Sequence, residues 1–443
     1  MINNLLTETL YNLKYNQYSR LLEKLKGNVY RPTEELVNEQ NEALRCIIKF
    51  AFEDVHYYRE LVRDLGISVS DIQSVNDLIR LPIIDKKTIN ASREIFFSSS
   101  ERVFQWSSTG GSTGVPLRYR LDKECSMYAR LVSDRSWGYA GYKPGDHTVI
   151  FAGGSLVDSS QNYKKKVLNR LANMVSFSSY GVDDDRLHSL YCYLQKNKPE
   201  FMYGYASSIY FFSLYLERNE LSLESPPKAI FSTAEKLLPH QRQKIFSVMQ
   251  TEVFDAYGLN DGGVSAHECE CHNGFHIDFE RAILEVVDEQ GNQVKEGKGK
   301  VIATSLHNYA MPFVRYDTGD IATITHQPCE CGKTTPRLME IIGRITDYLK
   351  FGNSYIGSPV LTVLMGKLDL DLYQIKQDAE DHVIFKLVLP INANSDMKDK
   401  CVRHIRSSMS DRVSHVSVDI EFYDSVEQLG SLNKHKFIIN ETL

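Results

Sequence analysis

The sequence has no excess of basic residues and no long apolar run, and both absences exclude classes of protein. Acidic side chains outnumber basic ones by 57 to 51, which gives a formal net charge of −6 at pH 7. Nothing in this balance favours nucleic acid as a partner. No uninterrupted apolar segment approaches the roughly 18 residues of a membrane span. The N-terminus shows no charged segment followed by an apolar one, as a secretory signal has, so we expect a cytoplasmic protein.

Several familiar patterns are also missing. We find no dinucleotide fingerprint, no candidate catalytic triad, no internal repeat and no low-complexity segment. Dehydrogenase and hydrolase functions therefore have little support. The composition itself is ordinary, with 42% hydrophobic residues among 443, which is enough to bury a sizeable core.

One ten-residue segment, 107–116, contains three glycines and five hydroxyl side chains. Glycine frees backbone N–H groups to turn inward and small hydroxyls add donors, so the segment suits a polyphosphate. It is not a Walker A loop, because no Gly-Lys-Ser/Thr opens a helix after it. A solvated linker is the alternative for the segment taken alone. The candidate phosphate-binding residues are Ser107, Ser108, Thr109, Gly110, Gly111, Ser112, Thr113 and Gly114.

The order of sequence patterns predicts an α/β fold. Residues 1–80 read as an N-terminal helical region, and beyond the hydroxyl-rich loop short β-rich runs alternate with helical stretches. Examples of such runs are 147–152, 229–232 and 252–255. This alternation predicts mostly parallel sheets covered by helices.

Two further regions depart from that alternation. Between about 275 and 325 the pattern changes to hairpins, which predicts a β-rich subdomain. From about 346 a smaller α+β unit follows, with strands near 382–389 and 416–422 around a helix at about 396–410. We therefore expect a large N-terminal domain over 1–345 and a small, mobile C-terminal lid domain over 346–443.

Four of the eight cysteines form two Cys-x-Cys pairs about 60 residues apart, Cys269/Cys271 and Cys329/Cys331. In a reducing compartment, paired cysteines indicate a metal before a disulfide. Three histidines accompany the first pair, and tetrahedral zinc needs four ligands. Which four groups bind stays open from the residues alone, and unliganded cysteines on loops are the alternative.

Three other segments carry candidate binding groups. In 255–261, an aromatic residue beside a glycine after a predicted strand can stack on a base, and a carboxylate four residues on can hold Mg²⁺. In 313–320, the final carboxylate follows a glycine turn and can accept bonds from vicinal hydroxyls. A charged, glycine-led segment, 343–350, precedes the C-terminal unit as either a linker or a hinge.

Taken in order, these segments resemble the adenylate-forming enzymes, which include acyl-CoA synthetases, luciferases and nonribosomal adenylation domains. The resemblance is greater to the phenylacetate–CoA ligase branch, including CapK-type relatives found with capsular-polysaccharide genes. It extends from Leu81-Pro82 to the end of the chain. Five motifs carry it in the family's order: Ser107–Gly114, Ser232-Thr233-Ala234-Glu235, Tyr257-Gly258-Leu259-Asn260-Asp261, Arg315-Tyr316-Asp317-Thr318-Gly319-Asp320 and Gly343-Arg344.

The resemblance implies a two-step reaction. A carboxylic acid attacks the α-phosphate of Mg·ATP to give an acyl-adenylate and pyrophosphate, and a thiol, usually of coenzyme A, then takes the acyl group after the small domain rotates. The hydroxyl-rich loop would hold the β- and γ-phosphates, Tyr257 would stack on adenine, and Asp320 would hold the ribose, assisted by Arg344. The residues that the resemblance assigns to ATP or AMP outside the loop are Ala234, Glu235, Asp255, Ala256, Tyr257, Gly258, Asp320 and Arg344.

The resemblance also implies three catalytic residues: Thr109 in the loop, Asp261 as the Mg²⁺ ligand and Lys434 as the adenylation lysine. Lys436 is the rival of Lys434. Asp261 stands where the family usually has glutamate, and Leu117 stands where many members have lysine. Thr346 occupies the usual position of a charged hinge residue.

Some relatives of this branch have Cys-x4-Gly-x-His followed by Cys-x-Cys-Gly, and this chain matches that pattern. By this resemblance the ligands of a structural zinc ion are Cys269, His276, Cys329 and Cys331. Cys271 is the rival for His276 or Cys269.

The sequence leaves several functional questions open. The acid is not readable, and the acceptor can be coenzyme A, an amine, a sugar hydroxyl or a carrier-protein thiol. A non-catalytic nucleotide-binding homologue is the other alternative. The oligomeric state is also open, with a homodimer among the possibilities.

Overall fold

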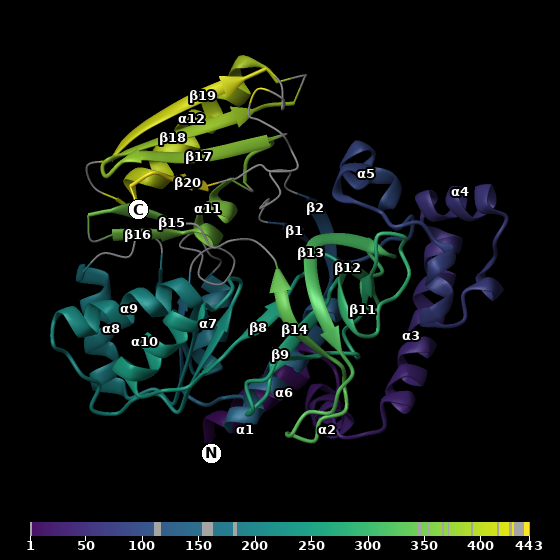
Figure 1. The fold of residues 1–443 in the computed structure, drawn as a ribbon, viewed down its shortest axis with the longest axis horizontal. Helices are drawn as coiled ribbons and strands as arrows, with labels where there is room; N and C mark the ends of the chain where they lie inside the picture. Colours follow the sequence, from purple (N-terminus) through teal and green to yellow (C-terminus); the bar gives the residue numbers. More distant parts are fainter. Residues whose placement is uncertain are drawn as a thin grey trace. The chain divides into compact units, whose positions relative to one another are not determined.

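The computed structural model describes residues 2–109, 117–152, 163–179, 184–342, 348–352, 354–365, 367–370, 372–390, 393–413, 416–424, 428 and 438–442. They pack as two compact units. The first contains the described parts of 1–108, 117–146 and 254–343, and the second contains Thr109 with the described parts of 147–253 and 344–443. Figure 1 colours the chain from one end to the other. The domain boundary between 345 and 346 stays a prediction.

The first unit begins with helices whose apolar residues recur every three or four positions. In α3 (Thr33–Asp54), Leu44, Ile47, Ile48 and Ala51 are fully buried on one face. This spacing places them on one stripe of a helix, which explains why the segment is helical and which face packs inward. The helices of this unit are α1 (Ile2–Lys14), α2 (Tyr18–Asn28), α3, α4 (His56–Leu65), α5 (Lys86–Ala91) and α6 (Lys123–Trp137), with short 3₁₀ turns at Val69–Asp71, Val75–Arg80, Arg93–Phe96 and Gly138–Ala140.

The first unit also holds an antiparallel sheet of seven strands, in the order β11-β12-β13-β14-β10-β9-β8. The predicted hairpins are its centre: β11 pairs with β12, and β12 with β13. A separate two-stranded sheet joins β1 (Phe104–Ser108) to β2 (Arg118–Asp122). The seven strands are β8 (Ala256–Gly258), β9 (Ser265–Glu268), β10 (Phe275–Ile277), β11 (Ala282–Val287), β12 (Gly297–Ser305), β13 (Tyr316–Thr325) and β14 (Arg337–Ile342).

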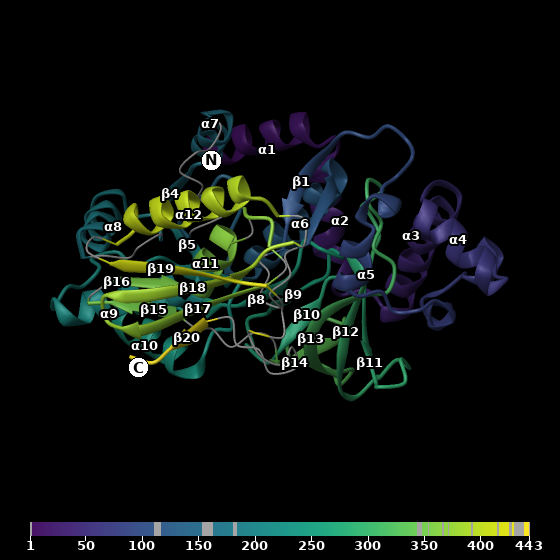
Figure 2. The same ribbon diagram turned by 90° about the horizontal axis from the view of Figure 1, so that it is seen from above.

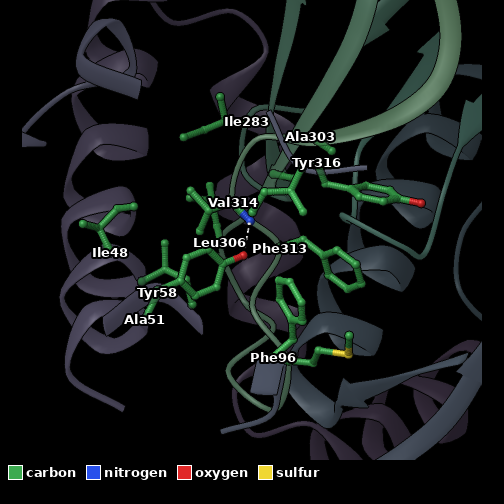
Figure 3. Packing of buried hydrophobic residues seen from close by; sticks show 14 of the residues in the cluster. Ile48, Ala51, Tyr58, Phe96, Ile283, Ala303, Leu306, Phe313, Val314 and Tyr316 are labelled. Carbon is green, nitrogen blue, oxygen red and sulfur yellow. Dashed lines mark hydrogen bonds between the residues drawn. The ribbon is translucent and has the colours of Figure 1, made fainter. Parts of the chain in front are cut away.

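A buried cluster joins the N-terminal helices to this sheet. Figure 3 shows Ile48, Ala51 and Tyr58 facing Val314 and its neighbours. The Tyr58 hydroxyl accepts a hydrogen bond from the Val314 amide at 3.1 Å and donates one to the Pro312 carbonyl at 3.1 Å. The phenol therefore satisfies the backbone just before β13 inside an apolar core, where unpaired groups are costly.

A buried charged network fixes α6 against the turn between β10 and β11. The Arg135 guanidinium pairs with the carboxylates of Asp278 and Glu280, and Asp278 also contacts His267 and Ser265. Burial would raise the pKa of Asp278, but His267 and Arg135 outweigh it and hold that pKa at about 2. The carboxylate is thus ionised and paired at neutral pH.

The second unit contains the parallel sheet, in the order β4-β3-β5-β6-β7. Strand β3 pairs in parallel with β4 and β5, and β5 with β6. A Cβ at Gly204 would lie 2.2 Å from the Phe151 carbonyl oxygen, so only glycine fits between these strands. The elements are β3 (Thr148–Ala152), α7 (Tyr163–Leu171), β4 (Met174–Ser178), α8 (Asp184–Asn197), β5 (Phe201–Tyr205), α9 (Ala206–Arg218), β6 (Ala229–Thr233), α10 (Pro239–Met249) and β7 (Val253–Phe254).

The C-terminal part of the second unit is α+β. Four strands follow the order β19-β18-β17-β20, and Figure 2 shows α12 lying across one face of them. The Asn394 side chain caps α12 by accepting a hydrogen bond from the Met397 amide at 3.0 Å. The elements are β15 (Tyr348–Phe351), β16 (Ser354–Gly357), α11 (Ser358–Met365), β17 (Leu372–Ala379), β18 (His382–Val388), α12 (Ser395–Ser410), β19 (Ser417–Tyr423) and β20 (Ile438–Asn440).

The predicted α/β fold is confirmed, but the sheets are not mostly parallel as the sequence pattern predicted. Among the described strands, the largest sheet is antiparallel, and parallel pairs occur in the β3–β6 region and in two pairs near the C-terminus. Within those same residues, no helix has both the length and the apolarity to cross a bilayer.

Candidate functional site

Three residues of the hydroxyl-rich segment, Ser107, Ser108 and Thr109, are described by the structure. Ser107 is on β1, and its hydroxyl donates to the Tyr119 hydroxyl on β2 at 3.1 Å. Ser108 is exposed and Thr109 is buried. The remaining predicted loop residues lie outside the described residues: Gly110, Gly111, Ser112, Thr113 and Gly114.

The predicted adenine-border segment follows β6 in the second unit. Ala234 has φ +67°, a left-handed conformation that a residue with a Cβ rarely adopts. The Glu235 carboxylate accepts a hydrogen bond from the Ser207 amide at 2.7 Å, at the start of α9. A carboxylate at a helix N-terminus is favoured by the orphan amides and the helix dipole. Glu235 therefore has a structural task that the sequence did not predict.

Tyr257 and Asp320 meet within the first unit. The Tyr257 hydroxyl donates to the Asp320 carboxylate at 2.9 Å, from β8 to β13. These strands are separated by three others in the sheet order, so the sheet curls to bring them together. One hydrogen bond thus joins the motif predicted to bind adenine to the motif predicted to bind ribose. Beside them, Asp255 is buried, and Ala256 and Gly258 complete β8.

The loop after β8 holds Asp261 in a buried position. Its carboxylate accepts a hydrogen bond from the Tyr316 hydroxyl at 2.9 Å. Gly262 has φ +79°, and a Cβ there would lie 2.5 Å from that of Ala303. Arg281 braces the loop by donating to the Leu259 carbonyl at 3.0 Å.

Two phenols of this site were not predicted from the sequence. Tyr119 bonds Ser107 and Tyr316 bonds Asp261, and both rings contact Phe313, with centroids 5.8 and 5.0 Å away. Tyr316 lies inside a recognised motif, but its position gave no signal of a partner 55 residues away. Of the other predicted residues, Arg344 and Lys434 lie outside the described residues, as does the rival Lys436.

Four predicted metal ligands converge in the first unit. The ligand atoms of Cys269, His276, Cys329 and Cys331 all lie within 4.8 Å of one another. Cys269 Sγ is 3.8 Å from Cys329 Sγ, and Cys331 Sγ is 3.3 Å from His276 Nε2. A tetrahedral zinc ion with Zn–S bonds of about 2.3 Å sets its sulfur atoms about 3.8 Å apart, so the donors fit that ion.

Surrounding groups fix the orientation of His276 and the two loops. His276 Nδ1 donates to the Thr335 carbonyl at 3.1 Å, which directs Nε2 toward the thiols. Burial lowers the pKa of His276 to about 4, so the ring is neutral at pH 7. Arg337 donates to the carbonyls of Asn273, at 2.6 Å, and Gln327, at 3.0 Å, and so links the loops that carry the two cysteine pairs.

The rival ligand Cys271 lies beside the cluster, because its thiol interacts with the thiols of Cys269 and Cys329. Cys271 is half-buried and is not among the four residues whose ligand atoms converge. Burial raises the pKa of the Cys331 thiol to about 12, whereas hydrogen bonds from Cys331 and Cys269 lower the pKa of the Cys329 thiol despite its burial. A bound cation would therefore be needed to hold Cys331 as a thiolate at neutral pH. The positive charge of Lys333 is already paired with the Glu270 carboxylate at 2.7 Å, so it is not available to the thiols alone.

Known proteins with similar sequences include phenylacetate–coenzyme A ligases and CapK. A phenylacetate–coenzyme A ligase of Thermus thermophilus is 29% identical over 336 residues, which cover 72% of each chain. Protein CapK of Staphylococcus aureus is 23% identical over 460 aligned positions, which cover 97% of this chain and 98% of CapK. No protein-family model matches the sequence.

A solved structure has a similar fold. A crystal structure of 2-hydroxyisobutyryl-CoA ligase, in complex with 2-HIB-AMP and CoA in the thioesterification state, superposes with a TM-score of 0.64. The match covers 93% of this chain and 91% of that one at 18% identity, which shows a shared fold. The chain is therefore similar in sequence to phenylacetate–coenzyme A ligases and to CapK, and it has the fold of 2-hydroxyisobutyryl-CoA ligase.

Proposed function

We propose that this protein is an ATP-dependent carboxylate ligase that forms an acyl-adenylate and transfers the acyl group to a thiol, that of coenzyme A. The observation that carries the proposal is the Tyr257–Asp320 hydrogen bond, because it joins the motifs expected to bind adenine and ribose. The homologous phenylacetate–coenzyme A ligases support the same reaction class.

In the first step, a carboxylate oxygen of the acid attacks the α-phosphorus of ATP. The bond to the bridging oxygen of pyrophosphate breaks, and pyrophosphate leaves with that electron pair. Two anions must approach each other here, so the site has to supply hydrogen-bond donors and positive charge away from water. We assign the phosphate contacts to Ser107, Ser108, Thr109 and the loop residues that follow them, and the positive charge to Lys434.

The remaining assignments follow the same motifs. The Tyr257 ring would stack on adenine, and Asp320 would accept hydrogen bonds from the ribose hydroxyls. Mg²⁺, when bound, would neutralise phosphate charge with Asp261 as its ligand. In the second step the thiol sulfur attacks the acyl carbon, AMP leaves with its oxygen, and the thiol proton passes to solvent.

We also propose that Cys269, His276, Cys329 and Cys331 hold a structural zinc ion. Its four protein donors would leave no open position for substrate, which separates it from catalytic zinc. The Thr334 hydroxyl donates to the Arg31 carbonyl at 2.5 Å, so the second cysteine loop is tied to the junction of α2 and α3. The ion would thereby stabilise the packing of the N-terminal helices on the sheet.

The decisive experiment is pyrophosphate–ATP exchange with a panel of carboxylic acids, followed by hydroxylamine trapping of the adenylate. We expect exchange with at least one acid, a strongly reduced exchange rate in Asp320→Asn at low ATP concentration, and an unchanged rate in Asp317→Asn. Asp317 is a suitable control because it lies in the same motif, with its carboxylate accepting from the Gly319 amide at 2.8 Å. Absence of exchange with every acid would support a nucleotide-binding protein without ligase activity.

A second candidate acceptor follows from the nearly full-length alignment with CapK. An adenylating ligase of this lineage can pass its acyl group to an amine, a sugar hydroxyl or a carrier-protein thiol. Adding coenzyme A to a parallel reaction without hydroxylamine, and measuring thioester, separates coenzyme A from the other acceptors. The cytoplasmic location and the homodimer stay predictions.

A further inference from the structure

The β1–β2 hairpin has one buried face and one exposed face. Across the hairpin, Trp106 is opposite Arg120 and Ser108 is opposite Arg118, and opposed residues of antiparallel strands share a face. The residues that alternate with these arginines on β2, Tyr119 and Leu121, are buried. Trp106, Arg118 and Arg120 therefore lie on the face directed away from the core.

This outer face is a cluster of aromatic rings and guanidinium groups. The Arg120 guanidinium lies over the rings of Phe97, 3.8 Å from the centroid, and Phe104, 4.3 Å away. Arg118 lies over the Trp106 ring at 5.1 Å. Trp106 is nevertheless 48% exposed. A solvent-exposed indole that is flanked by two guanidinium groups offers stacking area and positive charge at one place.

The positive charge of this face is not neutralised within the described residues. Among the described residues, neither Arg118 nor Arg120 forms an ion pair. Burial lowers the pKa of the Arg120 guanidinium. The one carboxylate on the hairpin is Asp122, which accepts hydrogen bonds from the Tyr309 amide at 2.7 Å and the Ala310 amide at 3.0 Å. It also pairs with Arg102 at 3.8 Å. The complementary ligand is thus an anion with a flat aromatic group.

We propose that this face binds the phosphorylated nucleotide end of coenzyme A, with the base on Trp106 and phosphate groups against Arg118 and Arg120. The identity of the ligand rests on the proposed function, and the chemistry of the surface favours a phosphorylated nucleotide over a carrier protein. A protein partner needs about 800 Å² on each side, whereas one indole and two guanidinium groups match a single nucleotide. Guanidinium groups are the side chains best suited to bind phosphate in a bidentate way.

The number of tryptophans makes this proposal directly measurable. The chain has two, and Trp137 is only 6% exposed, so Trp106 is the solvent-accessible fluorophore. We would titrate the full chain with coenzyme A, dephospho-coenzyme A, pantetheine and a uridine-diphosphate sugar. Saturating AMP in every sample keeps coenzyme A out of the adenylate site. We expect saturable quenching by coenzyme A, about 5- to 10-fold weaker binding of dephospho-coenzyme A, and no quenching by pantetheine.

Variants test the named side chains. Arg118→Gln and Arg120→Gln should each raise the dissociation constant of coenzyme A about 5- to 10-fold. Trp106→Leu should raise it about 10-fold or more, measured by equilibrium dialysis because the fluorophore is lost. Gln105→Ala is the matched control on the same strand, since its side chain contacts Ser126 at 3.2 Å on the other face. Trp137→Phe should keep the quenching. Thermal melts identify any variant that fails to fold.

Unchanged affinity in folded Arg118→Gln and Arg120→Gln variants would overturn the proposal. Tighter binding of the uridine-diphosphate sugar, or capture of an acidic carrier protein without coenzyme A binding, would overturn the choice of ligand. The titration uses neither ATP hydrolysis nor a carboxylic acid. A chain that binds coenzyme A through Trp106 but shows no pyrophosphate exchange would therefore refute the ligase proposal and leave this site intact.

Discussion

The Cys/His cluster and the nucleotide motifs belong to the same curled sheet, but their polar groups are satisfied differently. In the cluster, three thiols and one imidazole converge within 4.8 Å. At the nucleotide motifs, the carboxylates of Asp320 and Asp261 each accept a hydrogen bond from a tyrosine hydroxyl. A cluster of soft donors stabilises its folded arrangement only when a cation joins it, whereas the phenol–carboxylate pairs hold the predicted nucleotide-binding carboxylates in place without a ligand.

The largest effect should come from breaking the cluster. We expect Cys329→Ser to lose its bound zinc and at least about 4 kcal/mol of unfolding free energy, because removal of a structural metal is among the few changes that cost so much. Zinc content by atomic absorption and chemical denaturation measure the two losses. Cys46→Ser is the matched control, since Cys46 is exposed and outside the cluster. Full zinc occupancy in Cys329→Ser would refute the ligand assignment.

The pH dependence of stability separates the effect of a buried histidine outside the cluster from that of the proposed metal site. Burial lowers the pKa of His307 to about 4, as it does for His276, but His307 Nε2 donates to the Glu280 carbonyl at 2.8 Å, away from any thiol. Its folded pKa lies below its unfolded value of about 6.5, so the unfolded chain binds more protons between those values. Stability should therefore fall as the pH drops from 6.5 to 4.

The contribution of His307 to that fall should be up to about 3 kcal/mol. We expect His307→Gln to make stability less dependent on pH across this window, without any change in zinc content at pH 7. Denaturation midpoints at several pH values, with zinc measured in parallel, check both statements. A pH dependence equal to that of the unaltered protein would show that His307 is not the responsible group.

The nucleotide motifs should give a smaller and more selective effect. We expect Asp320→Asn to raise the KM for ATP about 10- to 100-fold, because a charged acceptor of ribose hydroxyls is lost. Tyr257→Phe keeps the ring and removes only the phenol, so its effect on KM should be less than that of Asp320→Asn. Steady-state kinetics of pyrophosphate exchange compare the two. An equal or larger effect of Tyr257→Phe would place the phenol, and not the carboxylate, at the ribose.

The smallest effect should come from Tyr316→Phe. This variant removes the donor to Asp261, and we expect a loss of about 1 kcal/mol in stability and about a 5-fold rise in the Mg²⁺ concentration needed for half-maximal exchange. Tyr58→Phe is a useful comparison, since it removes another buried phenol that binds only backbone groups. A stability loss in both variants with no shift in Mg²⁺ dependence would limit Tyr316 to a structural role.

The sequence located the motifs better than it identified their contacts. The cysteine pairs were visible from spacing, and the resemblance named the four residues whose donor atoms converge in the structure. The roles of Tyr119 and Tyr316 were not predicted, because each forms a hydrogen bond with a residue that is distant along the chain or on another strand. Glu235 was expected at the adenine, and the structure adds its hydrogen bond to the first turn of α9.

The sequence by itself determined the α/β class, the hairpins after residue 275 and the order of the motifs, because these follow from local periodicity, turn residues and spacing. Only the tertiary structure decided that Tyr257 reaches Asp320, and that the donor atoms of Cys269, His276, Cys329 and Cys331 converge. Both results depend on the curl of a seven-stranded sheet and on the Arg337 side chain, which donates hydrogen bonds to carbonyls in both cysteine loops. Such long-range geometry results from the packing of the whole unit, so no short segment of sequence encodes it.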